Sequence, residues 1–395
     1  MHGIALQRTT EVPVASNEED KRVGSILAMR YQIRRVVADG GMGRVYEALD
    51  MQDKARVAIK ILHAEVANDP IALERFKREF EVSKLLSHEH IVDVRDFGEM
   101  GNKTFALVME FLEGEELRMV LRREKRLAPE RLVRVLSQAA IGLDSAHRQK
   151  LVHRDLKPDN VFLCGTREGD VVKLLDFGSV RDNSSMAKKL TVAGTTIGSP
   201  FYMAPEQAQG LESLDARADV WALAAITYEC LTGSVPFQGI NGPSILLAIL
   251  TQDPRPPSEA GKDGPYPIPP AIDEVMEVAL AKNANIRTGS VGALADAVGM
   301  AYGLSGEHKQ WAYLAQDALA EAIRAGLARA AAAPRPVSRT LDDSPPAAPA
   351  VGTVSTVPEE FIMGVPKGPP KWLVPAVVGV LAVIAGLLGA VFLMR

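Results

Sequence analysis

"HRDLKPDNVFL", residues 153–163, is the stretch of this sequence that decides the fold. Charged side chains, Asp155 and Lys157 among them, precede a short apolar run that is typical of a β-strand. Further along the chain, "DFG" stands at 176–178 at the end of another apolar run, and "APE" stands at 204–206. Any one of these motifs could arise by chance. All of them together, in this order and at these spacings, are strong evidence for one fold and one chemistry.

A glycine-rich segment lies nearer the N-terminus, in "VVADGGMGRVYEA" at 36–48. It places Gly40, Gly41 and Gly43 between two strand-like runs and is one glycine short of G-x-G-x-x-G, with Ala38 in the first position. Alone it is a weak signal. It could be a phosphate-binding loop with a tolerable substitution, a disabled one, or only a tight hairpin.

Charged residues that need a partner follow the glycine-rich segment. "VAIK" at 57–60 puts Lys60 at the end of an apolar strand, where a buried ammonium group needs a partner or a ligand. The stretch at 70–87 begins with proline and repeats apolar residues at helical spacing, which predicts an amphipathic helix that carries Glu79. A Lys–Glu pair alone is weak evidence, because exposed pairs of this kind contribute little to stability.

With these motifs, the sequence resembles the eukaryotic-like protein kinases, and among them the bacterial serine/threonine kinases, over about residues 30–302. The resemblance implies an α+β, bilobal protein kinase fold, with a small β-rich lobe at 30–111 and a larger helical lobe at 112–303. It also implies an enzyme that transfers the γ-phosphoryl group of ATP to Ser/Thr hydroxyls of proteins. The implied metal is Mg²⁺, with Mn²⁺ as an alternative.

The resemblance assigns this chemistry to particular residues. Asp155 is expected to orient the substrate hydroxyl and accept its proton, and Lys157 is expected to reach the transferred phosphate. Asn160 and Asp176 are expected to bind the metal, because carboxylate and amide oxygens suit a hard cation.

ATP itself is expected to lie between the glycine-rich segment and the strand that carries Lys60. Lys60, held by Glu79, is expected to bind the α- and β-phosphates, and the backbone of 110–112 is expected to bind adenine. The full set of residues expected to contact ATP is Val37, Ala38, Asp39, Gly40, Gly41, Met42, Gly43, Val45, Ala58, Lys60, Met109, Glu110 and Leu112.

Other matched positions have structural or regulatory roles in the family. Ser199 and the "DLKPDN" motif resemble the residues of serine/threonine kinases rather than those of tyrosine kinases. Asp219 resembles the carboxylate that steadies the catalytic loop, and Glu206 with Arg287 resembles an ion pair of the large lobe. Arg154 implies control by phosphorylation of the activation loop, for which the candidates are Thr191, Thr195 and Thr196.

An alternative from another functional class is a pseudokinase that acts as a membrane-anchored nucleotide-binding scaffold. Its only support in the sequence is Ala38, at the position where the family has glycine. Every ionisable position expected to do chemistry is filled by the expected residue type, which favours an active enzyme.

Segments outside the kinase-like region differ from it in composition. Residues 1–29 are expected to form a flexible tail. Residues 304–333 contain an alanine-rich stretch that predicts a helix from His308, which either leans on the large lobe or docks a partner. Residues 334–370 are rich in Pro, Ala, Ser and Thr and are expected to be a disordered linker.

The run at 372–394 carries no charge, and about 20 apolar residues suffice to cross a bilayer, so it predicts a single transmembrane helix. More Lys and Arg precede this run than follow it, which predicts a cytoplasmic kinase domain at the inner or cell membrane of a bacterium. Ala382, Gly386 and Ala390 have a spacing that could pair two such helices into a homodimer, although chance supplies it often in such runs.

Bulk composition narrows the partners. The formal net charge of −4 gives no basic surface for nucleic acid, so none is expected as a partner. With only Cys164 and Cys230, no disulfide framework is implied, and a reducing compartment fits.

Overall fold

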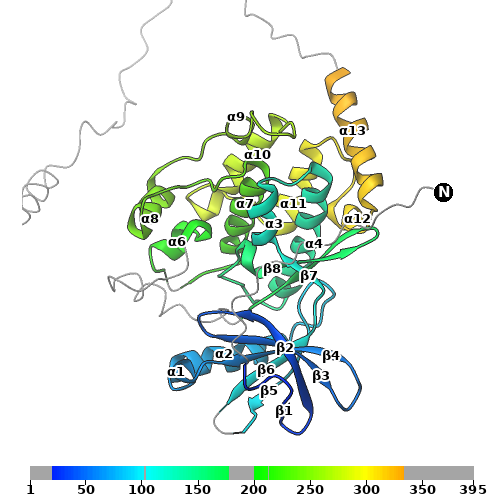
Figure 1. Ribbon diagram of the computed structural model, residues 1–395. Coiled ribbons are helices and arrows are strands. Elements are labelled where there is room, and N and C mark those ends of the chain that lie inside the picture. Colours follow the sequence, from blue (N-terminus) through cyan, green and yellow to red (C-terminus); the bar gives the residue numbers. More distant parts are fainter. Residues whose placement is uncertain (1–19, 102–103, 178–199, 212, 333–395) are drawn as a thin grey trace, which may run out of the picture. The chain divides into compact units, whose positions relative to one another are not determined.

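The computed structural model describes residues 20–101, 104–177, 200–211 and 213–332. All of them belong to one compact unit that spans Met1–Pro334, while the unit Arg335–Arg395 lies outside the described residues. Within the first unit a sheet-rich lobe precedes a helical lobe in the chain (Figure 1), as the α+β, bilobal expectation requires.

The N-terminal lobe is built on a six-stranded antiparallel sheet with the strand order β1-β2-β3-β4-β6-β5. Two helices, α1 (Ala64–Ala67) and α2 (Pro70–Ser83), connect β4 to β5. The strands are β1 (Ile26–Leu27), β2 (Tyr31–Asp39), β3 (Gly43–Asp50), β4 (Arg56–Leu62), β5 (Val94–Glu99) and β6 (Phe105–Glu110).

Strand β4 explains how this sheet separates two apolar clusters. Its odd-numbered residues from Val57 to Ile61 pack with Tyr31 and Tyr46 on one face. Because side chains alternate across a strand, Ala58, Lys60 and Leu62 share the other face, and Leu62 packs there with Phe76 of α2. Each fully buried Val or Ile stabilises the lobe by about 1.5–3 kcal/mol relative to an exposed one.

Helix α2 confirms the amphipathic helix expected at 70–87, although it ends at Ser83. Pro70 stands in the first turn, where its missing N–H costs nothing. The Asp69 side chain caps the helix by accepting a hydrogen bond from the backbone N–H of Ile71 at 2.9 Å. The helix presents Glu79 towards the face of the sheet that carries Lys60.

The C-terminal lobe is mainly helical, with α7 at its centre. Fifteen of its residues, from Ala218 to Thr232, are buried, as expected of a helix that is apolar on all sides. The lobe also contains a small antiparallel sheet of β7 (Gly114–Glu116), β8 (Val161–Thr166) and β9 (Gly169–Leu174), in this order. The α-helices of this lobe that precede the alanine-rich segment are α3 (Leu117–Glu124), α4 (Pro129–Arg148), α6 (Pro205–Ala208), α7 (Arg217–Thr232), α8 (Gly242–Thr251), α9 (Pro257–Ala260), α10 (Ala271–Ala279) and α11 (Val291–Ala301).

The alanine-rich segment forms two helices instead of the single one expected, α12 (His308–Trp311) and α13 (Gln316–Ala332). Helix α4 accounts for the interruption. The Gln138 amide of α4 donates to the carbonyl of Ala312 at 2.9 Å, and Arg134 donates to the carbonyl of Leu314. Carbonyl groups that would continue a helix are thus taken by side chains from another element.

Residues 20–29, the described part of the flexible tail expected at 1–29, belong to the N-terminal lobe. Ile26 and Leu27 pair with β2 as strand β1, and Asp20 accepts a hydrogen bond from the Tyr46 hydroxyl at 2.6 Å. These contacts fix residues that composition alone assigns to a loose tail.

Several expectations fall outside the described residues: residues 1–19, the linker at 334–370, the apolar run at 372–394, Ser199, and the candidate phosphorylation sites Thr191, Thr195 and Thr196. Among the helices of the described part of the chain, none combines the length and the apolar character needed to cross a membrane.

Candidate active site

Strands β3, β4 and β6 bring four of the expected ATP-contacting residues onto one face of the sheet. Lys60 stands opposite Val45 of β3, and Ala58 stands opposite Met109 of β6. Directly opposed residues of antiparallel strands share a face, and so do residues two apart in one strand. The same face carries the apolar cluster around Leu107, which offers a non-polar surface to a flat aromatic ligand.

Lys60 and Glu79 form a buried ion pair between β4 and α2. The Lys60 Nζ lies 3.2 Å from Glu79 Oε2, and only 18% and 10% of the two side chains are exposed. Burial raises the pKa of Glu79 to about 7, although the charge of Lys60 acts in the opposite direction. Burial lowers the pKa of Lys60, but the carboxylates of Glu79 and Asp176 outweigh it and raise that pKa above its ordinary value. Lys60 therefore stays charged.

The glycine-rich segment forms the turn between β2 and β3. The N–H of Gly40 donates to the carbonyl of Gly43 at 3.1 Å, which closes the turn. Gly43 has a steric reason to be glycine, because a Cβ there would lie 2.2 Å from the carbonyl oxygen of Ile61. Ala38 stands in β2 opposite Val45, and its φ is not in the left-handed region, so its methyl group brings no backbone strain.

Lys157 and Asn160 lie around Asp155 in the segment 153–160, which matches the expected catalytic loop and is given that name below. Lys157 Nζ donates to Asp155 Oδ2 at 2.7 Å, and the Asn160 amide donates to the Asp155 carbonyl at 2.7 Å. The Asp155 carboxylate raises the pKa of Lys157 against the lowering effect of burial, so Lys157 is a cation. The Leu175 N–H donates to the carbonyl of Asn160 at 2.9 Å, which fixes the segment that enters Asp176.

Asp219 of α7 holds the backbone of this loop through hydrogen bonds. Its two carboxylate oxygens accept the N–H groups of His153 and Arg154 at 2.8 and 2.9 Å. His147 Nε2 donates to the same carboxylate at 2.7 Å. Burial raises the pKa of Asp219, but the hydrogen bond and charge of His147 outweigh it, and the net pKa lies below the ordinary value.

Two residues at the site hold an unusual backbone conformation. Arg154 has φ 66° and Asp176 has φ 57°, and left-handed residues other than glycine are uncommon and strained. The Asp219 contacts hold Arg154, while the His153 ring supports the other segment by lying 4.6 Å from the Phe177 ring, centroid to centroid. Such strain persists only where the surrounding structure imposes it.

The donor set fits a magnesium ion. Because the Asn160 amide nitrogen is committed to the Asp155 carbonyl, its side-chain oxygen is the atom left to face a ligand. Asp176 supplies a carboxylate whose charge acts on Lys60 and Lys157, so it lies near both ammonium groups. Hard oxygen donors of this kind, with phosphate oxygens and water completing the shell, are typical of Mg²⁺ sites.

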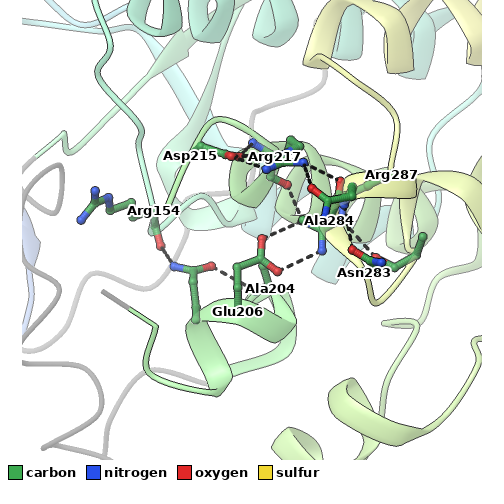
Figure 2. A network of polar contacts seen from close by, with 11 residues as sticks. Arg154, Ala204, Glu206, Asp215, Arg217, Asn283, Ala284 and Arg287 are labelled. Carbon is green, nitrogen blue, oxygen red and sulfur yellow. Dashed lines mark hydrogen bonds and ion pairs between the residues drawn. The ribbon is translucent and has the colours of Figure 1, made fainter. Parts of the chain in front are cut away.

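Glu206 and Arg287 form the expected ion pair of the large lobe (Figure 2). Arg287 donates to both carboxylate oxygens of Glu206, at 2.7 and 3.0 Å, and its side chain is fully buried. The same guanidinium donates to the carbonyls of Arg217 and Ala281. Gln207, next to Glu206, donates to the carbonyl of Arg154 at 2.7 Å, so this network reaches the catalytic loop.

Sequence reasoning missed a second buried network beside the catalytic loop. Arg118 donates to Glu229 at 2.9 Å and to Asp159 at 3.3 Å, and it also donates to the Tyr202 hydroxyl. His147 was missed as well. None of these contacts has a local sequence signal, since His147 and Asp219 are separated by 72 residues.

Comparison with known proteins places these features in a family. The family model described as "Protein kinase domain" matches residues 31–298. Serine/threonine-protein kinase PknH of Mycobacterium bovis is 35% identical over 357 residues, which cover 90% of this chain and 55% of the relative. Serine/threonine-protein kinase PknA of Mycobacterium tuberculosis is 38% identical over 281 residues, which cover 70% of this chain and 62% of the relative.

A solved structure agrees with the fold. The crystal structure of the PknI kinase domain of Mycobacterium tuberculosis has a TM-score of 0.56 and 28% sequence identity, and the match covers 71% of this chain and 99% of that structure. The chain spans less than two thirds of the length of the curated relatives named above. On the match over residues 31–298, this chain belongs to the protein kinase family and carries a serine/threonine protein kinase domain.

Proposed function

We propose that this protein transfers the γ-phosphoryl group of ATP to Ser or Thr hydroxyls of other proteins, with Mg²⁺ or alternatively Mn²⁺ as the metal. The observation that carries the proposal is the cluster around Asp155, whose carboxylate accepts a hydrogen bond from Lys157 and whose backbone carbonyl accepts one from the Asn160 amide, each at 2.7 Å. This is the combination of base, cation and oxygen ligand that phosphoryl transfer requires.

In the proposed reaction, Asp155 orients the substrate hydroxyl and accepts its proton as the new O–P bond forms. The bond between the γ-phosphorus and the bridging oxygen breaks, and ADP leaves with the electron pair. Lys157 stabilises the negative charge on the transferred group, and Lys60 holds the α- and β-phosphates in line. Glu79 keeps Lys60 in place.

Asn160 and Asp176 are the residues that would hold the magnesium ion. When bound, the ion neutralises phosphate charge and aligns the phosphates for transfer. No observation on the described residues favours the alternative of an inactive nucleotide-binding scaffold.

The test of this proposal uses the purified full chain with γ-labelled ATP, Mg²⁺ and a generic protein substrate such as casein. The proposal expects label on Ser and Thr after acid hydrolysis, and loss of transfer when the metal is chelated by EDTA. Label on Tyr alone, or no metal-dependent transfer, would contradict it.

We also propose regulation and a location, both of which rest on sequence. Autophosphorylation of Thr191, Thr195 or Thr196 would supply a phosphate to Arg154, and phosphopeptide mass spectrometry of the active and Asp155→Asn proteins would detect it.

The apolar run at 372–394 would tether the kinase domain to the cytoplasmic side of a bacterial membrane. Recovery of the full chain in the soluble fraction of disrupted cells would contradict the tether.

A further inference from the structure

The glycine-rich turn contains an acidic residue at a place that, in the proposed function, faces phosphates. Asp39 ends β2 and directly precedes Gly40. A carboxylate beside a triphosphate raises the free energy of binding, because like charges repel one another, and the effect is strongest where water is displaced. The structure contains a compensating arrangement around this one residue.

Arg44 pairs with the Asp39 carboxylate across the turn. Its Nε donates to Asp39 Oδ2 at 2.9 Å, and its Nη2 donates to the same oxygen. This hydrogen bond is the main reason why the pKa of Asp39 lies below its ordinary value, so the carboxylate is ionised at neutral pH. The positive charge of Arg44 thus lies directly against the Asp39 carboxylate of the turn.

The other side of the same guanidinium holds the segment that precedes the kinase domain. Arg44 Nη1 donates to Asp20 Oδ2 at 2.6 Å, and the Tyr46 hydroxyl donates to that oxygen at 2.6 Å. Only 10% of the Asp20 side chain is exposed. The family model matches residues 31–298, and Asp20 lies before this range. The contact therefore joins the glycine-rich turn to a residue outside the matched domain.

His63, just beyond β4, also contacts the turn. Its Nε2 lies 2.9 Å from the carbonyl oxygen of Gly40 and 3.2 Å from Asp39 Oδ1. Its backbone N–H donates to the carbonyl of Met42 at 3.1 Å. An isolated exposed ion pair contributes little, but here one arginine joins the turn to a buried carboxylate while a second side chain contacts the same turn.

We infer that Arg44 is a positioning residue for ATP, which neutralises Asp39 and ties the glycine-rich turn to the N-terminal flank at Asp20. The inference rests on the proposed ATP-dependent function and deepens it. In this role Arg44 acts through its contact with Asp39.

The experiment measures kcat and the KM for Mg·ATP of the full chain at low and high salt. Arg44→Ala is expected to raise the KM for ATP about fivefold and to change kcat less than about twofold. Asp39→Asn is expected to lower that KM, because it removes the carboxylate that repels the phosphates. The double variant is expected to return to within about twofold of the wild-type KM. The effect of Arg44→Ala should shrink in 0.5 M NaCl, where screening is strong, which a purely structural role would not produce.

Two further variants keep the test decisive. Arg44→Gln keeps hydrogen-bond donors but removes the charge, so it should reproduce the KM increase even if Arg44→Ala folds poorly. Arg255→Ala removes an exposed arginine that pairs with Glu259 of α9, and it should leave the KM for ATP unchanged. The inference is overturned if Arg44→Gln leaves that KM within twofold of wild type, or if adding Asp39→Asn fails to restore it. Absence of ATP turnover in the wild-type chain would instead overturn the proposed function itself.

Discussion

Glu79 of α2 and Lys60 of β4 meet through a single contact of 3.2 Å between Oε2 and Nζ, on the face of the sheet where Val45, Ala58 and Met109 also lie. The contact joins the only long helix described in the N-terminal lobe to the strand that would hold the phosphates. A displacement of α2 away from β4 would lengthen this contact. The position of α2 is therefore expected to control how well Lys60 binds ATP.

The buried pair predicts a pH dependence. The pKa of Glu79 is raised to about 7 in the folded protein, above its ordinary 4.5. The stability that this group contributes is therefore present below pH about 4.5 and lost as the pH rises through about 7. The activity is expected to change with pH in the opposite direction to the stability, because only the ionised carboxylate of Glu79 forms an ion pair with Lys60. We expect kcat/KM for ATP to fall as the pH drops below about 7.

Glu79→Gln provides the check on this assignment. It should lower kcat/KM for ATP by about 10- to 100-fold at pH 8, because the charge-assisted hydrogen bond is lost. It should also remove the acidic limb near pH 7 from the pH–rate profile. An unchanged acidic limb in the Glu79→Gln protein would show that another group causes it.

Loss of the Asp219 carboxylate is expected to lower kcat without weakening the binding of Mg·ATP. In Asp219→Asn, one side-chain oxygen is replaced by an NH₂ group that would face the N–H of His153 or Arg154. We expect kcat to fall about 10- to 100-fold, because the loop that carries Asp155 loses its anchor, while the dissociation constant for Mg·ATP changes less than about threefold. A higher dissociation constant with normal kcat would contradict this role.

The Glu206–Arg287 pair predicts a large stability effect. Arg287→Ala leaves the carboxylate of Glu206 without its bidentate partner in a site where the arginine side chain is fully buried. Breaking such a buried pair costs about 3–5 kcal/mol in the free energy of unfolding, measured by guanidinium denaturation. Arg255→Ala, at an exposed pair, should cost less than about 1 kcal/mol. Equal destabilisation by the two variants would contradict the assignment.

Helix α13 predicts a steric effect at a glycine. A Cβ on Gly326 would lie 2.2 Å from the carbonyl oxygen of Gly303. Gly326→Ala should therefore lower the Tm, at a cost of about 1–3 kcal/mol, although alanine is the better helix former. Gly165→Ala is the matched control, because a Cβ there meets nothing within 4 Å. A higher Tm for Gly326→Ala would show that α13 does not pack closely on this turn.

Local sequence was enough to predict the two lobes, α2, the strand that carries Lys60 and the strand that precedes Asp176, because alternation and helical periodicity are properties of short segments. The motif residues around Asp155 were predictable because the motif itself is contiguous. The interruption between α12 and α13 was not, since it depends on donors from α4, 174 residues away for the Gln138 contact. The contact between Asp20 and Arg44 likewise joins a residue outside the motifs to one inside them, and no periodicity reports such a pairing.

Phosphoryl transfer centred on Asp155 is tested most directly by comparing the wild-type full chain with Asp155→Asn, measuring both label transfer from γ-labelled ATP and the dissociation constant for Mg·ATP. The control is Asp263→Asn, at an exposed loop residue, which should behave as wild type. We predict that Asp155→Asn lowers transfer about 10²- to 10⁴-fold while the dissociation constant stays within about threefold of wild type. Transfer at the wild-type rate by Asp155→Asn would contradict the account.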